Sequence, residues 1–308
     1  NGRVNEQDVR DALSERQDAP RGPRPGARIQ VVPQARMLAR QEGIDLAEVT
    51  GTGPDGRILV TDLEEAISQR EAAGALAVAR ADAVSEVMPL TGLRKTIADR
   101  MSMSVSTMAQ VTLTTEVDVT ELLKLRESLV SAWRPHRLRP VDLDVIIAVV
   151  ASALKAHPRM NAHLVDGEVL MLKEVNIGLA MSVADGLVVP VLKGVDLLDL
   201  LGVARGMRQL SDRVRQGQLR VDDVTGAGFT MTSLSSYDID AFTPIIDPPQ
   251  VAILGLGRAK EKPTVYQGEI TVRSMMHLSV TFDHRALDGA PVSEFIRTLS
   301  AGLESPDW

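Results

Sequence analysis

Hydrophobic and polar positions follow two different periods along residues 88–308. Apolar residues recur every three or four positions in five segments, which predicts amphipathic helices at residues 93–103, 120–133, 142–155, 199–216 and 290–303. Shorter apolar runs between them predict strands at residues 187–192, 228–232, 251–256, 270–273 and 276–282. Helices and strands that mix without a strict alternation favour an α/β sandwich over a barrel or a doubly wound nucleotide-binding fold.

The strand predicted at residues 276–282 alternates between apolar and polar positions and is followed by a histidine. If the pleat continues, His284 lies on the apolar side, where a neutral imidazole suited to a general base is favoured. The next residues predict a tight turn at Gly289, with Asp288 folding back to brace the strand end. The alternative is a core histidine without a catalytic role, and the spacing alone does not decide between them.

The N-terminal part of the chain contains an internal repeat at a constant offset of 54 residues (55 − 1). Asn1-Gly2-Arg3-Val4 recurs as Asp55-Gly56-Arg57-Ile58, and a capping box is predicted at Thr61-Asp62-Leu63-Glu64. Residues 17–30 are rich in proline, glycine and arginine, which is typical of an extended linker. We therefore predict a remnant of a first module at 1–16, a linker at 17–30, a complete module at 31–70, a second linker at 71–87 and a large domain at 88–308.

Composition and charge narrow the possible classes of function. The absence of cysteine excludes a disulfide framework, thiolate zinc sites and a cysteine nucleophile. The net charge of −7 argues against a general nucleic-acid-binding surface. The longest apolar stretch, residues 145–156, is too short to cross a bilayer, and no histidine pair has zinc-ligand spacing. We predict no metal, no nucleic acid and no membrane among the ligands and partners.

The segment His284-Arg285-Ala286-Leu287-Asp288-Gly289 fits the pattern His-x-x-x-Asp-Gly, and Thr281-Phe282-Asp283 precedes it. This region resembles the dihydrolipoyl acyltransferase branch of the chloramphenicol acetyltransferase superfamily, whose members form the cores of 2-oxo acid dehydrogenase complexes. Further matches to this family precede the motif, in the same order along the chain, at residues 88–101, 116–120, 176–180, 186–191 and 242–250. The resemblance implies a two-layer α/β sandwich of the chloramphenicol acetyltransferase type, and it favours the catalytic interpretation of His284.

The implied reaction moves an acyl group, with acetyl as our first choice, from S-acyl-dihydrolipoyllysine to CoA. His284 is the implied general base toward the CoA thiol. A strand hydroxyl stabilises the oxyanion in this family, and by register it is Thr232, with Ser233 as the adjacent alternative. The resemblance implies that Asp288 is a structural brace held through an arginine, for which Arg94 and Arg100 are the candidates.

Residues 31–70 resemble a peripheral subunit-binding domain, a small all-α module that tethers partner enzymes. Arg36 and Arg40 lie one helical turn apart and Arg57 follows a glycine loop, so the three arginines can form one basic face for acidic partner residues. The implied partners are the decarboxylase and dihydrolipoyl dehydrogenase components. The alternative is a solvated face without a partner.

The resemblance also implies an active site between the subunits of a trimer, and larger cores built from trimers. The chain departs from the family's frequent Pro-His-Phe at Met108-Ala109-Gln110, so succinyl and branched-chain acyl groups stay open. The lipoyl group is expected on a domain upstream of Asn1. Two alternatives are a non-catalytic scaffold subunit and a free-standing acyltransferase for a small hydroxyl or amine. The cytoplasm is expected for a bacterial source, and the mitochondrial matrix is the alternative.

Overall fold

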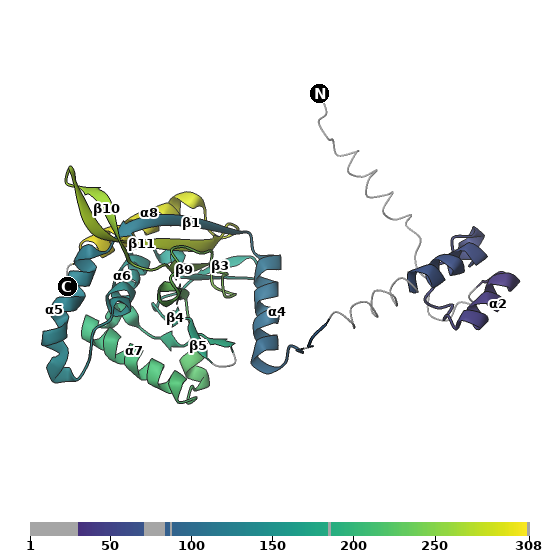
Figure 1. The fold of residues 1–308 in the computed structure, drawn as a ribbon, viewed down its shortest axis with the longest axis horizontal. Coiled ribbons are helices and arrows are strands. Elements are labelled where there is room, and N and C mark those ends of the chain that lie inside the picture. The colour runs from purple at the N-terminus through teal and green to yellow at the C-terminus, as the bar shows by residue number, and fades with distance from the viewer. Residues whose placement is uncertain (1–29, 71–83, 87, 184–185, 307–308) are drawn as a thin grey trace, which may run out of the picture. The chain divides into compact units, whose positions relative to one another are not determined.

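The computed structural model describes residues 30–70, 84–86, 88–183 and 186–306 of the chain (Figure 1). The chain divides into two compact units between Met88 and Pro89, and each unit is described by itself. The repeat copy predicted at residues 1–16 lies outside the described residues, as does most of both predicted linkers.

The smaller unit is a short helical module with its own core. Helix α2 (Pro33–Glu42) starts with proline at its first turn and ends at Gly43, whose φ of 63° forms a left-handed cap. A 3₁₀ turn, η1 (Pro54–Gly56), and a helix over residues 60–70 follow. The fully or almost fully buried side chains at the centre of the unit are Ala35, Ala39, Ile58 and Leu63.

The second helix of this unit is capped by Asp62, and the capping box predicted to start at Thr61 is wrong. The helix already begins at residue 60, so the Asp62 carboxylate reaches back and accepts the backbone amide of Leu59 at 2.9 Å. It also accepts the amide of Thr52 at 2.9 Å and the Thr52 hydroxyl at 2.6 Å. The Thr52 hydroxyl and the two amides lower the pKa of Asp62. Asp62 therefore joins the glycine-rich loop to the helix.

The larger unit contains the five predicted helices, each within four residues of the predicted ends. They are α4 (Gly92–Thr107), α5 (Thr120–Trp133), α6 (Asp142–Ala156), α7 (Leu200–Arg215) and α8 (Gly289–Glu304). Short 3₁₀ turns connect them: η2 (Arg134–His136), η3 (Pro158–Met160), η4 (Val195–Leu197), η5 (Val221–Val224) and η6 (Ser235–Tyr237).

A seven-stranded mixed sheet forms the centre of this unit, in the order β1-β11-β9-β8-β4-β7, with β10 paired to β11. Its strands are β1 (Gln110–Asp118), β4 (Ile177–Leu179), β7 (Val191–Leu192), β8 (Phe229–Ser233), β9 (Ala252–Leu256), β10 (Lys260–Tyr266) and β11 (Glu269–Asp283). Two small hairpins accompany it: β2 (Ala162–Val165) with β3 (Glu168–Met171), and β5 (Met181–Val183) with β6 (Gly186–Val188).

The two faces of the sheet differ, and this difference positions the site. On β8, Phe229 and Met231 belong to the main hydrophobic core, and the ring of Phe229 lies 5.9 Å from that of Phe295 on α8. Because side chains alternate along a strand, Thr230 and Thr232 point to the opposite face. Helices α6 and α8 supply many of the other core side chains. The expected α/β sandwich is confirmed, with its polar strand positions facing away from the helices of the core.

Candidate active site

His284 does not continue the pleat of β11, so its predicted burial on the apolar side is wrong. The strand ends at Asp283, and His284 begins a turn with 47% of its side chain exposed in the single chain. Its backbone amide donates to the carbonyl of Ala109 at 2.8 Å. Its ring lies 5.5 Å from the ring of Phe282. The imidazole is therefore accessible, while the backbone that carries it is fixed.

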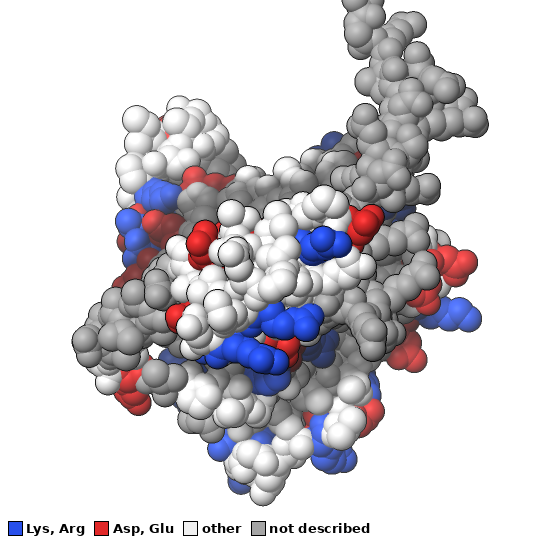
Figure 2. Space-filling view, turned by 90° about the vertical axis from the view of Figure 1, so that its right-hand side faces the viewer, with Lys and Arg blue, Asp and Glu red and all other residues white. Residues whose placement is uncertain are grey.

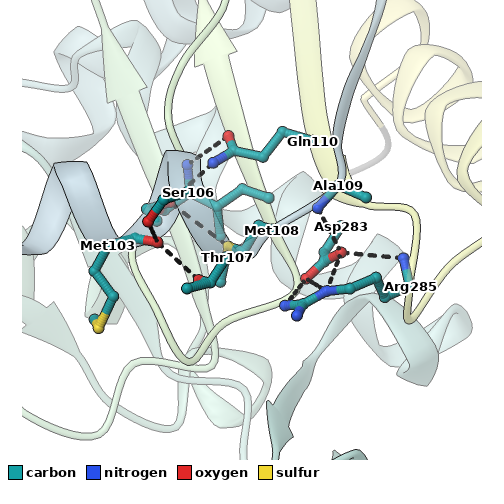
Figure 3. A network of polar contacts seen from close by, with 10 residues as sticks. Met103, Ser106, Thr107, Met108, Ala109, Gln110, Asp283 and Arg285 are labelled. Atoms are coloured by element: carbon teal, nitrogen blue, oxygen red, sulfur yellow. Dashed lines mark hydrogen bonds and ion pairs between the residues drawn. The ribbon is translucent and has the colours of Figure 1, made fainter. Parts of the chain in front are cut away.

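The turn at His284 is held by an ion pair between its two neighbours in the sequence (Figure 3). Asp283 is fully buried and accepts bonds from the Arg285 guanidinium at 2.6 and 3.0 Å and from the backbone amides of Arg285 and Ala109. Burial alone would raise the pKa of the Asp283 carboxyl, but these donors outweigh it and hold the pKa below its ordinary value. Asp283 therefore stays charged and ties the strand end to the start of β1.

Asp288 does not brace the strand end in the single chain. It is the N-cap residue of α8, its side chain is 77% exposed, and its carboxylate lies 4.0 Å from Nδ1 of His284. Of the two candidate arginines, Arg100 pairs with Asp247 at 2.8 Å instead. Asp283 with Arg285 fills the predicted role. The predicted turn after the strand is present at residues 284–286, but Gly289 is the first residue of α8 and lacks a positive φ, so the predicted part of this glycine in the turn is wrong.

Thr232 lines a cavity of about 560 Å³ on the face of the sheet opposite to α8. Walls of the cavity come from α4, from the β5–β6 hairpin and from residues 242–247, and they are mostly apolar: Leu93, Ile97, Met101, Ala180, Leu187, Val188, Val189, Val224, Phe242, Pro244, Ile245 and Ile253. The neighbouring Ser233 bonds Ser235 at 2.9 Å and does not line this cavity. Among the two predicted hydroxyls, Thr232 is thus the one placed toward a ligand-sized space.

One ion pair lies in the wall of this cavity. Arg100 on α4 contacts the Asp247 carboxylate at 2.8 Å and donates to the carbonyl of Pro248 at 3.0 Å. Burial raises the pKa of Asp247, and the guanidinium of Arg100 opposes that rise. The charge of Arg100 is therefore already balanced from within the wall.

Thr232 and His284 do not meet within one chain. Thr232 pairs with Gly255, and Gly255 pairs with Ser279, five residues before the histidine on β11. At ~3.3 Å per residue, this places the Cα atoms of the two residues about 17 Å apart along the strand direction. A site that uses both groups needs a second chain.

Helix α4 is only lightly covered by its own chain. Ser104 is its one buried residue, whereas Leu93, Met103 and Val105 are 42%, 47% and 60% exposed. A 16-residue helix with exposed aliphatic side chains is typical of a surface that packs against another protein molecule.

The three arginines predicted to bind partners are all exposed in the small unit. Arg36 and Arg40 follow the buried positions Ala35 and Ala39 on α2, so they lie at the edge of the solvent face. Nη2 of Arg57 lies 3.4 Å from Oε1 of Gln30. Figure 2 shows lysine and arginine side chains (blue) interspersed with acidic and uncharged surface.

Five residues around the site were not predicted from the sequence: Ser104, Gln110, Ile246, Asp283 and Arg285. Asp283 and Arg285 flank His284, and their opposite charges could have indicated the ion pair. Ser104, Gln110 and Ile246 are far apart in the sequence, and no local pattern connects them. Among the described residues, no three His, Asp or Glu side chains are grouped so that they could bind a metal ion, and no helix is both long and apolar enough to cross a membrane.

Solved structures with this fold define the class as an α/β acyltransferase core. A probable dihydrolipoamide acetyltransferase from Listeria monocytogenes superposes with a TM-score of 0.70 at 31% identity, over 72% of this chain and 95% of that chain. The dihydrolipoamide acetyltransferase of Azotobacter vinelandii superposes with a TM-score of 0.69 at 32% identity, over 72% and 92%. That enzyme was investigated for the role of a serine, a histidine and an asparagine in its catalytic mechanism.

Curated relatives extend the similarity to nearly the whole chain. The dihydrolipoyllysine-residue acetyltransferase component of the acetoin cleaving system of Bacillus subtilis is 35% identical over 91% of this chain and 70% of its own length. The lipoamide acyltransferase component of the branched-chain alpha-keto acid dehydrogenase complex of Pseudomonas aeruginosa is also 35% identical, over 94% and 69%. Residues 82–308 match the family described as 2-oxoacid dehydrogenases acyltransferase (catalytic domain), and residues 29–64 match the e3 binding domain. The chain therefore belongs to the acyltransferase family of the 2-oxoacid dehydrogenases.

Proposed function

We propose that this chain transfers an acyl group from S-acyl-dihydrolipoyllysine to CoA, with His284 as the base and Thr232 as the oxyanion donor. One observation carries the assignment of these residues. Thr232 precedes His284 by 52 positions (284 − 232), and the serine and histidine investigated in the Azotobacter enzyme have the same spacing. Thr232 also lines the apolar cavity. A hydroxyl in the place of a serine keeps the donor that the oxyanion needs.

The side chains act in one sequence of proton and acyl transfers. The His284 imidazole takes the proton of the CoA thiol, and the thiolate attacks the carbonyl carbon of the acyl-dihydrolipoyl thioester. The hydroxyl of Thr232 donates a hydrogen bond to the tetrahedral oxyanion. Collapse of this intermediate expels the dihydrolipoyl thiolate, which receives the proton from the imidazolium. The products are acyl-CoA and the dihydrolipoyl group.

Two groups on separate chains require an oligomer, and we propose a trimer. The separation of Thr232 from His284 within one chain supports this assembly, as do the exposed aliphatic side chains of α4. In a ring with one repeated contact, each interface joins the His284 end of one chain to the Thr232 cavity of the next. Association of trimers into a larger core is a further part of the proposal, and a solved relative at 32% identity is described as a cubic core.

The acyl group is proposed to be uncharged, with acetyl as the first candidate. The cavity wall is apolar and its Arg100 is balanced by Asp247, so a succinyl carboxylate gains little from this arginine. Sequence identity does not separate the candidates, because acetyl-, branched-chain and succinyl-transferring relatives are 35%, 35% and 32% identical. The comparison of acyl donors must therefore be made with the protein itself.

One assay tests the reaction, the base and the acyl group. Transfer between dihydrolipoamide and acetyl-, isobutyryl- or succinyl-CoA is measured for the wild type and for His284→Ala. We expect acetyl-CoA to be the best donor and His284→Ala to lose ~100-fold or more of the turnover. Undiminished turnover by His284→Ala would exclude this base. An inactive wild type that still binds partner enzymes would instead support the scaffold function.

The small unit is proposed to bind dihydrolipoyl dehydrogenase and the decarboxylase of the same complex through Arg36, Arg40 and Arg57. The match of residues 29–64 to the e3 binding domain and the exposure of all three arginines support this proposal. The lipoyl group is proposed to belong to a domain upstream of residue 1, and the compartment to be the cytoplasm of a bacterium. Double substitution of Arg36 and Arg40 by alanine should weaken dehydrogenase binding, measured by calorimetry at two salt concentrations. The matched control changes the exposed Gln34 and Gln41 to alanine on the same helix and should bind normally.

A further inference from the structure

The side chain of Gln110, the first residue of β1, closes a ring of hydrogen bonds with α4 and with the loop before β9 (Figure 3). Its Nε2 donates to the Ser104 hydroxyl at 2.9 Å, and its Oε1 accepts the backbone amide of Ile246 at 3.3 Å. The Ser104 hydroxyl donates to the carbonyl of Ile246 at 2.6 Å. Ser104 and Ile246 are completely buried, so loss of one partner leaves unsatisfied polar groups away from water.

The backbone around Gln110 holds the histidine end of β11. Gln110 is opposite Asp283 in the antiparallel register of β1 and β11. The preceding residue, Ala109, accepts the backbone amide of His284 at 2.8 Å and donates to the Asp283 carboxylate at 3.3 Å. A shift of Gln110 therefore moves Ala109 and Asp283, which fix the backbone of His284.

The side-chain bonds of Gln110 reach the other half of the site. Ile246 lies between Ile245 and Asp247, which both line the cavity that contains Thr232. The amide group of Gln110 is thus one link between the backbone that carries His284 and the cavity wall of the same chain, beside the pairing of β11 with β9.

We propose that Gln110 is a positioning residue, with Ser104 as its partner, that sets the His284 end and the cavity wall at a fixed separation. This inference rests on the proposed transferase function. In a trimer, the His284 end and the cavity wall of one chain belong to different active sites. Gln110 therefore fixes the geometry of the two active sites to which its chain contributes. Gln110 acts through Ala109 and Ile246 and does not touch the reacting atoms.

Four variants of the full chain test this role. Gln110→Met keeps the length of the side chain and removes both bonds, whereas Gln110→Glu keeps the acceptor for Ile246 and loses the donor. Ser104→Ala removes the hydroxyl with little change in volume. Gln218→Met makes the same substitution at an exposed position and is the matched control. For each protein, kcat and KM for CoA, the pH dependence of kcat/KM, the melting temperature and the oligomer size are measured.

We expect Gln110→Met to lower kcat ~10- to 100-fold with a smaller change in KM for CoA, since small displacements of a catalytic group have effects of this size. The kcat of Gln110→Glu should lie between that of Gln110→Met and that of the wild type. Ser104→Ala should show the same loss of kcat as Gln110→Met, and Gln218→Met should have the wild-type kcat. A shifted acid limb of the pH profile should accompany the loss. If Gln110→Met does not fold, Ser104→Ala and Gln110→Glu decide the outcome.

Wild-type kcat and an unchanged pH profile in the folded variants, with only a lower melting temperature, would overturn the positioning role. The His284 ring resonance, titrated by NMR, gives a second readout that needs no turnover. A wild type without transferase activity refutes the proposed function. An unaltered His284 resonance in both Gln110→Met and Ser104→Ala refutes the positioning role, so the two failures are distinguishable.

Discussion

At the scale of single residues, the charge of Asp283 matters to the fold because the carboxylate is buried and satisfied by donors from two segments. Burial favours its neutral form, but the bonds from Arg285 and Ala109 outweigh this effect and lower its pKa. The folded state therefore binds fewer protons at this group than the unfolded state. Its contribution to stability is present above the unfolded pKa and disappears as the pH falls through the lowered folded pKa.

Asp283→Asn should lower the free energy of unfolding at pH 7 by about 1–2 kcal/mol, because the charge-assisted bonds with Arg285 are lost. This is the lower part of the usual range, since the Arg285 side chain is 46% exposed and solvent screens it. Urea unfolding of both proteins between pH 3 and 7 measures the effect. The difference should shrink toward pH 3, and a difference that is constant with pH would contradict the proposed charge of Asp283.

The pKa of Asp144 is shifted in the opposite direction, upward. It lies in the first turn of α6, is 3% exposed and accepts the amide of Val141 at 2.9 Å, and burial raises its pKa to about 6. The folded state therefore binds more protons than the unfolded state between about pH 4 and pH 6. Stability from this group is fully present below its unfolded pKa and is lost as the pH rises through about 6.

Asp144→Asn keeps an oxygen for the amide of Val141 and has no charge to bury. We expect the variant to be more stable than the wild type at pH 8 by roughly 1–3 kcal/mol and similar to it at pH 4. Thermal unfolding across this range measures the difference. A variant that is destabilised equally at both values would show that the carboxylate is favourably placed in its charged form.

At the scale of elements, the bend between β9 and β10 depends on Gly257. Leu256 pairs with Leu278 and Lys260 pairs with Met275, so the connecting stretch contains one extra residue opposite β11. A Cβ atom at Gly257 would lie 1.8 Å from the carbonyl oxygen of Asp240. Because that obstacle is backbone, the loop and the strand must separate to admit a side chain.

Gly257→Ala should lower the free energy of unfolding by about 2 kcal/mol or more, as overpacking against fixed atoms does. Gly289→Ala is the matched control, because nothing lies within 4 Å of a Cβ atom there and its φ is not positive. We expect no loss of stability for the control and a gain of up to about 1 kcal/mol. Chemical unfolding compares the two, and equal stability of both variants would contradict the close approach of Asp240.

The sequence pattern predicted some helices and strands well and missed others. Helix α7 has a strong apolar stripe and a capping aspartate, Asp199, so its limits were predicted within one residue. Strand β10 was not predicted, because it lies at the edge of the sheet and begins with three charged residues. The predicted strand 187–192 is two strands, β6 and β7, interrupted before Val191 by Pro190, which has no amide for a ladder. Local periodicity thus predicts elements that bury one face, and it misses exposed edges.

For the candidate site, the motif indicated His284 and the strand register indicated Thr232, but neither gave their separation. That separation follows from the pairing of β8 with β9 and of β9 with β11, which joins residues 22 to 30 positions apart in the sequence (278 − 256 and 282 − 252). The exposure of His284 also could not be predicted. It arises because the strand ends at Asp283, one residue before the histidine, where the Asp283 carboxylate bonds to Arg285. A sequence motif therefore identifies the residues of the site, whereas tertiary contacts determine their positions and exposure.

At the scale of the whole molecule, the proposed division of the site between chains predicts complementation between two inactive proteins. His284→Ala retains the Thr232 cavity, and Thr232→Ala retains the base. If each site takes its histidine from one chain and its threonine from the next, mixed trimers contain some sites with both groups intact. With equal amounts of the two variants and random assembly, about a quarter of the sites are intact, because each of the two positions is wild type with a probability of about one half.

The two variants are unfolded together, refolded as a mixture and assayed for acyl transfer, with each variant refolded alone as the control. The mixture should recover about a quarter of the wild-type turnover, while each variant alone stays near its own low level. Mixing the folded trimers without unfolding them should give no recovery, since no chains exchange. A refolded mixture of wild-type oligomer size that regains nothing would contradict the shared site. It would require the base and the hydroxyl to meet in one chain, against the strand register that separates them.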